Sequence, residues 1–274
     1  GDMHDHFVPH PSSTSTSTFP FACTHVMVAG HHFPDAALAA TGDPTLRSPA
    51  GDAAGAAGVG VAIAPGGDHN TRTTGWQGSS EATKGTQENI RRLARNELDF
   101  ALANAAISYF AVRGEGKWEA KQEIRTVMTL APNIALFITP SGSGVNTMAD
   151  LRGKRVVVGP AGAGFDHFLR PILQAHGITY DDFTPLHNTQ AGAVDMLADG
   201  SAAAAFLGGA VPTASITQAS ASQDIHFIPF DAAARDALFE RYPFFAPAKI
   251  PADTYRDQRE EYDGMNVGYM HLIT

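Results

Sequence analysis

The sequence is poor in charge and in cysteine. Charged residues make up 17% of the 274 positions, and Cys23 is the one cysteine. A lone cysteine cannot form an internal disulfide, so cysteine usage leaves the redox compartment open. The low charge excludes a coiled coil, and the lack of a long apolar run excludes a membrane-spanning helix. The length predicts two modest domains or one large domain.

Positive charge is scarcer than negative charge. The chain has 19 Lys and Arg against 28 Asp and Glu, a formal net charge of −9. An acidic surface repels phosphate backbones, and no basic cluster interrupts it, so no nucleic-acid partner is predicted. The 12 histidines come without an HExxH pattern or a Cys/His framework. No metal site is therefore predicted.

Residues 1–80 differ in composition from the rest. They contain no Lys and no Glu, and Arg47 and Arg72 are their only Lys or Arg residues. Residues 11–18 are low in complexity, and residues 48–67 are mostly small, so this segment buries little apolar area. We expect it to be poorly ordered or the product of a foreign reading frame, with strand candidates at 24–30 and 58–63. Its acidic start shows no intact secretory signal.

From Glu81 onward, strand-like runs alternate with helix-period segments, which predicts an α/β fold. A helix is expected over 86–96 with Thr86 as its cap. Strands are expected at 99–103, 124–130, 134–139, 155–159, 202–207 and 225–230. The order within 155–230 is typical of a parallel sheet. Pro171 predicts a kink or a late start in the helix that follows Gly164.

Glycine-bearing junctions introduce three of these helices. They are GPAGAG at 159–164, TKGT at 83–86, and the pair Gly208-Gly209 followed by Pro212. Parallel strands gather their carboxyl ends at one sheet edge, where ligands bind, and helix N-termini attract anions. Three such junctions together favour an anion site at this edge. Each junction taken alone is equally well explained as an ordinary tight turn.

A nucleotide- or cofactor-dependent enzyme is the alternative, with the Gly162–Gly164 turn holding a phosphate. The G-x-G-x-x-G pattern fails because His167 occupies its third glycine position. The SGSG sequence at 141–144 lacks the G-x-S-x-G pattern of a nucleophile turn. We therefore predict no catalytic residues.

Five segments resemble the TAXI-family solute receptors of TRAP transporters. They are TKGTQEN (83–89), LDFALAN (98–104), LRGKRV (151–156), GPAGAG (159–164) and AAAFLGG (203–209). The resemblance covers about residues 81–274. It implies an extracytoplasmic, monomeric type II binding protein with two α/β lobes. Such a receptor carries a small carboxylate solute (a glutamate-like amino acid, a dicarboxylate or a 2-oxoacid) to TRAP membrane subunits, without cofactor or catalysis.

The resemblance also implies a domain plan and a binding site. The first lobe would comprise residues 81–138 and about 231–274, the second would comprise 139–230, and the two crossing segments would form a hinge. The residues implied to face the solute are Thr83, Lys84, Gly85, Thr86, Asn104, Gly162, Ala163, Gly164, Phe165, Gly209, Pro212 and Thr213.

The sequence departs from the family at two places. Ala163 and Phe165 replace hydroxyl residues of the family's Gly-Ser-Gly-Thr turn, so Phe165 is expected to pack on an apolar part of the solute or to turn into the core. The family's Gly-Gly-x-Tyr-Tyr turn is not recognisable in residues 1–80, and the chain ends in a strand where the family continues. We therefore expect an incomplete first lobe, and a ligand sensor of the same fold remains an alternative.

Overall fold

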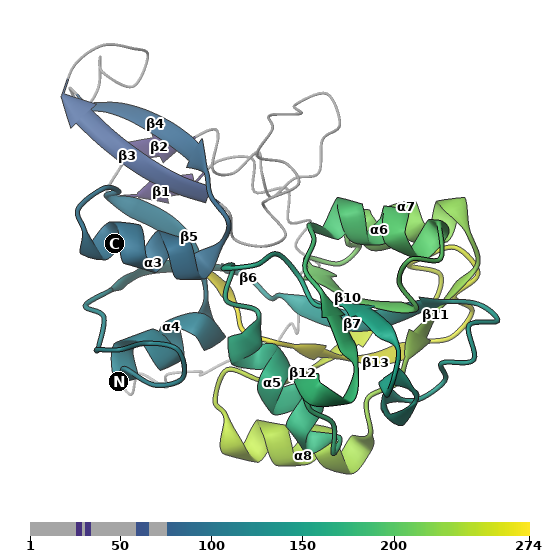
Figure 1. Ribbon diagram of the computed structural model, residues 1–274. Coiled ribbons are helices and arrows are strands. Elements are labelled where there is room, and N and C mark those ends of the chain that lie inside the picture. Colours follow the sequence, from purple (N-terminus) through teal and green to yellow (C-terminus); the bar gives the residue numbers. More distant parts are fainter. Residues whose placement is uncertain (1–25, 29–30, 34–58, 66–75) are drawn as a thin grey trace, which may run out of the picture.

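Two β-sheets with helices packed on them make up the part of the chain that the computed structural model describes, residues 26–28, 31–33, 59–65 and 76–274 (Figure 1). The predicted two-lobe α/β fold is confirmed. The predictions for residues 1–25, 29–30, 34–58 and 66–75 lie outside the described residues. Within the described ranges, no helix has the length and apolar character needed to cross a bilayer.

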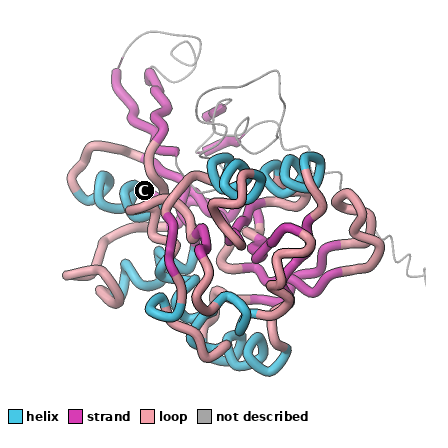
Figure 2. The backbone as a smooth tube through the Cα atoms, turned by 45° about the vertical axis from the view of Figure 1, so that its right-hand side comes forward, coloured by secondary structure: helices cyan, strands magenta, loops and turns pink. Residues whose placement is uncertain are grey.

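The first lobe contains an antiparallel sheet with strand order β4-β3-β5-β14-β6. Its elements are β3 (Val59–Pro65), β4 (Trp76–Ala82), α3 (Thr86–Ala94), β5 (Phe100–Asn104), α4 (Ala105–Arg113), β6 (Thr126–Ala131) and β14 (Met270–Ile273). The β3–β4 pair extends beyond the helices of this lobe in both views (Figures 1 and 2). A separate antiparallel pair joins β1 (Val26–Val28) to β2 (His31–Phe33). Strands β1 and β3 therefore fall on the two early apolar runs predicted to be strands.

The second lobe has the strand order β12-β13-β7-β10-β8-β9, and β11 also pairs with β7. Its strands are β7 (Ile134–Pro140), β8 (Arg155–Val157), β9 (Thr184–Leu186), β10 (Ala204–Gly209), β11 (Ile225–Ile228), β12 (Ala246–Ile250) and β13 (Tyr262–Asn266). Its helices are α5 (Asp166–Ala175), α6 (Gln190–Ala198), α7 (Ala214–Ser222) and α8 (Ala232–Arg241).

The chain passes between the two sheets after β6 and again after β13. These passages lie near residues 132 and 268, whereas the sequence placed them near 138 and 231. The difference arises because β7 pairs with β10 and β11, while β13 extends the sheet from β7 and β12 from β13. Helix α8 and strands β12 and β13, which follow residue 231, therefore belong to the second lobe.

Strand β8 lies between β9 and β10 and is parallel to both. From β8 the chain crosses to β9 on one side, and from β9 it crosses back over β8 to β10 on the other side. Because both crossovers are right-handed, their helices lie on opposite faces of the sheet. Helices α5 and α8 pack together on one face, and α6 and α7 pack together on the other (Figure 1). The predicted parallel arrangement is confirmed for β8, β9 and β10, and β7 runs antiparallel between β10 and β11.

Strand β7 divides the apolar core. Ala135 and Phe137 join the cluster on the α5 face, and Leu136 and Ile138 join the cluster on the α6 face, as the alternation of a strand requires. The cluster on the α5 face continues into the first lobe, where it includes Ile107. One continuous apolar core therefore serves both lobes.

Helix α5 runs through Pro171, so the late start predicted from this proline is wrong. The helix begins at Asp166 and buries Phe168, Leu169 and Ile172 at helical spacing. The burial of these side chains outweighs the hydrogen bond that proline removes.

The start of α3 also differs from the prediction. Gly85, with φ of 134°, is the N-cap, and no side chain caps it. The hydroxyl of Thr86 accepts a hydrogen bond from the backbone N–H of Asn104 at 3.0 Å. Thr86 therefore ties α3 to the end of β5 and does not cap its own helix.

Asparagine side chains fix the two crossing segments. Asn266 Oδ1 accepts hydrogen bonds from the backbone N–H groups of Asn133 and Gly268, both at 3.1 Å. Asn104 Nδ2 donates to the carbonyl of Gly268 at 3.1 Å. Gly268 has φ of 120°, and a Cβ there would lie 2.8 Å from the backbone nitrogen of Ala106. The crossing thus requires a glycine and two buried amides.

Replacing Asn266 by alanine tests this role. The Asn266→Ala variant leaves two buried N–H groups without their acceptor, so the free energy of unfolding should fall by about 3 kcal/mol. The exposed Asn146 supplies a matched control, and Asn146→Ala should change stability by less than about 0.5 kcal/mol. Urea unfolding measures both variants. Equal stability of the two would contradict the role of Asn266.

Candidate functional site

The carboxyl ends of β8 and β10 point toward the first lobe. The turn at 159–164 follows β8 and leads into α5, and the turn at 209–213 follows β10 and leads into α7. Because the strand order reverses at β8, this edge is a topological switch point, the usual ligand position in open α/β sheets. Figure 1 shows α4 of the first lobe beside α5 of the second, and the two helices are in contact.

The two lobes meet directly at the 162–164 turn. The backbone N–H of Gln87, in the first turn of α3, donates to the carbonyl of Ala163 at 3.2 Å. Gly164 has φ of 98°, and a Cβ there would lie 3.0 Å from Ile107 Cδ1 and 3.1 Å from Gln87 Cβ. A helix N-terminus of one lobe thus holds a carbonyl oxygen of the other.

Lys84 lies beside this contact. Its side chain is exposed, and a Cβ on Gly162 would lie 4.0 Å from Lys84 Cδ. The backbone N–H of Lys84 donates to the Glu88 carboxylate at 3.1 Å, and the Thr83 hydroxyl donates to Asn89 Oδ1 at 2.6 Å. The structure therefore brings the loop at 83–86 and the turn at 162–164 together.

Asn104 takes part in a different way. Its Oδ1 accepts hydrogen bonds from the N–H groups of Ala106 and Ile107 and caps α4, while its Nδ2 donates to the crossing segment. The side chain is 2% exposed. In this structure the side chain of Asn104 therefore caps a helix and holds the crossing segment, and its role toward a solute stays a prediction.

Phe165 turns into the core, one of the two outcomes expected for it. Its ring lies 5.1 Å from that of Phe168, and a Cβ on Gly159 would come within 2.3 Å of it. The carbonyl of Ala163, rather than its side chain, faces the first lobe.

The turn at 209–213 contacts other elements of its own lobe. The N–H of Thr213 donates to the hydroxyl of Tyr255 at 2.8 Å, and the Thr213 hydroxyl donates to the carbonyl of Ala210 at 3.2 Å. The side-chain amide of Gln190 binds both backbone groups of Gly208, at 2.9 Å and 3.2 Å. Gly209 is buried and Pro212 is exposed. The amide of Thr213 is thus already paired within the second lobe.

Sequence reasoning missed Gln87, Ile107 and Tyr255. Gln87 lies in the first turn of a predicted helix, where backbone N–H groups lack helical partners, so its amide could have been selected by position. Ile107 and Tyr255 reach their contacts through tertiary packing, and no local pattern marks them.

A hydroxyl–imidazole pair lies beneath α4. Ser108 Oγ and His271 Nε2 are 2.9 Å apart, and His271 Nδ1 lies 3.5 Å from Thr126 Oγ1. Burial lowers the pKa of His271 to about 4, so the ring is neutral and a weak base at pH 7. Both side chains are buried, and the pair joins α4 to β14. It gives no support to the alternative of an enzyme.

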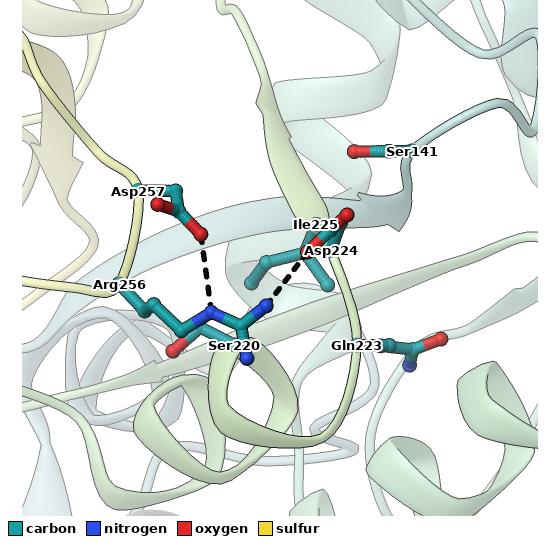
Figure 3. Close-up of a pocket in the computed structure, with 7 residues that line it drawn as sticks. All are labelled: Ser141, Ser220, Gln223, Asp224, Ile225, Arg256 and Asp257. Atoms are coloured by element: carbon teal, nitrogen blue, oxygen red, sulfur yellow. Dashed lines mark hydrogen bonds and ion pairs between the residues drawn. The ribbon is translucent and has the colours of Figure 1, made fainter.

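A surface hollow of about 290 Å³ lies at the opposite end of the second sheet (Figure 3). It adjoins the end of β7 and the start of β11, and none of the predicted site residues lines it. Arg256 donates to Asp224 at 2.8 Å and to Asp257 at 3.1 Å. These exposed groups satisfy one another, and the hollow lies away from the switch point.

The glycine at 164 is testable by a matched pair. In Gly164→Ala, the added Cβ must displace α3 or α4, and the left-handed backbone adds strain. Gly142 has φ of 84° with nothing within 4 Å of an added Cβ, so Gly142→Ala carries the backbone strain alone. We expect Gly164→Ala to lose about 2 kcal/mol more stability than Gly142→Ala by urea unfolding. Equal losses would show that the lobes do not meet at this glycine.

Comparison with known proteins gives partial structural similarity to periplasmic binding proteins. The aliphatic sulphonate binding protein SsuA from Escherichia coli is 15% identical, with a TM-score of 0.38 over 53% of this chain and 44% of that one. The alkanesulfonate-binding protein SsuA from Xanthomonas axonopodis pv. citri, bound to MOPS, is 21% identical, with a TM-score of 0.38 over 53% and 47%. A periplasmic binding protein from Brucella ovis with glutathione bound is 12% identical, with a TM-score of 0.37 over 67% and 45%. This chain spans less than half the length of each of these three proteins.

The family model gives the broader match. It extends over residues 54–271, which is most of the chain and includes both lobes. The chain belongs to the NMT1-like family.

Proposed function

We propose that this chain is an extracytoplasmic solute-binding receptor whose lobes close on a small carboxylate and release it unchanged. The solute class is that of glutamate-like amino acids, dicarboxylates and 2-oxoacids. The partner would be the membrane subunits of a TRAP transporter, as for the TAXI receptors that the sequence resembles. Membership of the NMT1-like family is compatible with the proposal and leaves the transporter type open.

The contact between Gln87 and Ala163 is the observation that carries the proposal. It places an amide donor of the first lobe against an oxygen acceptor of the second, at the switch point of the sheet. A solute carboxylate between parted lobes would supply an acceptor oxygen of the same kind to the Gln87 amide. The positive end of the α3 dipole favours a negative charge there.

Lys84 adds a full charge to this position. Its exposed side chain belongs to the first lobe and lies beside Gly162 of the second, where an added Cβ would be 4.0 Å from Lys84 Cδ. A charge-assisted hydrogen bond from an ammonium to a carboxylate is stronger than a neutral one. We therefore assign Lys84 to the solute, with the backbone amide of Gln87 as the second donor.

The packing of the turn disfavours the alternative of a nucleotide-dependent enzyme. A nucleotide whose phosphate is held at 162–164 would need a wide separation of the lobes, because even a Cβ added on Gly164 would lie 3.0 Å from Ile107 Cδ1 and 3.1 Å from Gln87 Cβ. A compact solute held between the lobes requires only a small separation of the same surfaces.

Calorimetric titration with amino acids, dicarboxylates, 2-oxoacids and alkanesulfonates tests the solute class. We expect one carboxylate class to bind, and Lys84→Ala to weaken that binding about tenfold. Lys121 is also exposed and lies beyond the C-terminus of α4, so Lys121→Ala is the control and should bind as the parent chain does. Mass spectrometry should recover the solute unchanged.

Two results would overturn the proposal. One is the absence of binding to every carboxylate in the panel, and the other is a product in the recovered solute. Equal affinities of Lys84→Ala and the parent chain would move the site away from the 83–86 loop.

A further inference from the structure

One histidine of the second lobe is held between two aromatic rings of the first. His167, in the first turn of α5, stacks on Phe110 of α4 with ring centres 5.4 Å apart. Its other neighbour is Trp118, in the segment after α4, at 6.0 Å and an interplanar angle of 19°. The imidazole is 5% exposed, and its Nε2 has no hydrogen-bond partner.

The backbone of the first lobe closes around this ring. Gly116 has φ of 71°, and a Cβ there would lie 3.1 Å from His167 Cε1 and Nδ1. An ion pair between Lys117 and Asp166 also joins the two lobes next to the ring. His167 is therefore enclosed by a glycine turn and two aromatic rings, with an ion pair beside it. The contact between the lobes thus depends on whether this imidazole is protonated.

We propose that His167 is a proton-sensitive latch: the neutral ring holds the lobes together, and the protonated ring leaves its aromatic slot and lets the second lobe swing away. If the chain binds a solute between its lobes as proposed above, release would then be favoured in acid. Only the link to solute release rests on the proposed function. The pH-dependent contact between the lobes does not depend on a solute.

The charges around the ring decide the direction of the effect. Three charged groups act on it: Asp166 from α5, Lys117 from the segment after α4, and Arg91 from α3, which also lies over the Trp118 ring at 5.6 Å, while α4 contributes the uncharged ring of Phe110. Burial lowers the pKa of His167 to about 4, Asp166 opposes this change, and Lys117 and Arg91 reinforce it. Cation–π attraction to the two rings would favour the imidazolium, but it is smaller than the cost of removing that ion from water.

The sign follows from linkage. Above pH 6.5 the ring is neutral whether it is buried or free. As the pH falls toward 4, a free imidazole takes up a proton and the buried one does not, so the closed form loses population. At pH 5 the closed form should be disfavoured roughly twentyfold relative to pH 7.

Trp118 reports on the latch without any solute. The chain has two tryptophans, Trp76 and Trp118, so Trp76→Phe leaves one emitter. Between pH 7.5 and 4.5 its emission should shift to longer wavelength as the lobes part, while far-UV circular dichroism stays constant. Adding His167→Phe should abolish the shift. His176, half-buried at the far end of α5, is the control, and His176→Gln should retain it.

Charge variants separate the latch from a merely structural role. Lys117→Met removes a neighbouring cation and raises the pKa of the buried ring, which narrows its gap from the free ring, so the loss of the closed form between pH 7 and 4.5 should shrink about threefold. Asp166→Asn breaks the same ion pair but lowers the pKa of the buried ring, so it should not reduce that loss. A shift that persists in His167→Phe, or an equal pH-dependent loss of the closed form in both charge variants, would overturn the latch. If His167→Phe does not fold, the difference between the two charge variants in their pH-dependent loss of the closed form decides. Failure to bind any solute would overturn the proposed function and leave this measurement intact.

Discussion

The close approach of three backbone segments at Gly164 fixes how the two lobes meet. The first turns of α3 and α4 reach this glycine from one lobe, and the 162–164 turn carries it in the other. Any side chain there would push the helices apart, and the Gln87 hydrogen bond to Ala163 would be lost with them. The shared apolar core and the aromatic slot around His167 depend on the same approach, because they lie on the faces that it brings together.

Much of the second lobe could be predicted from local sequence. Strands β7, β8 and β10 are apolar on both faces, and glycine turns separate β8 and β10 from the helices that follow, so these strands and the edge selected as a candidate site followed from pattern. The Gly159–Gly164 turn was selected because it joins a strand to a helix, and it does lie at the contact between the lobes.

The remaining features depend on pairing across long sequence distances. Strands β12 and β13 were assigned to the wrong lobe because β13 joins the second sheet through β7, more than a hundred residues earlier, and β12 joins it through β13. Asn104 is an ordinary cap in local sequence, and its bond to Gly268 depends on the crossing. The sequence allowed two environments for Phe165, because an aromatic residue after a glycine turn can contact a ligand or pack in a core. In the structure its ring packs against Phe168 in the core.

The most direct test of the receptor account is a residue-resolved titration of backbone amides by ¹⁵N NMR with the carboxylate that binds best. The account predicts that the amides of Gln87 and of residues 162–164 move first and furthest, in step with the calorimetric affinity. Movement confined to the hollow around Asp224 and Arg256, with Gln87 unaffected, would contradict it.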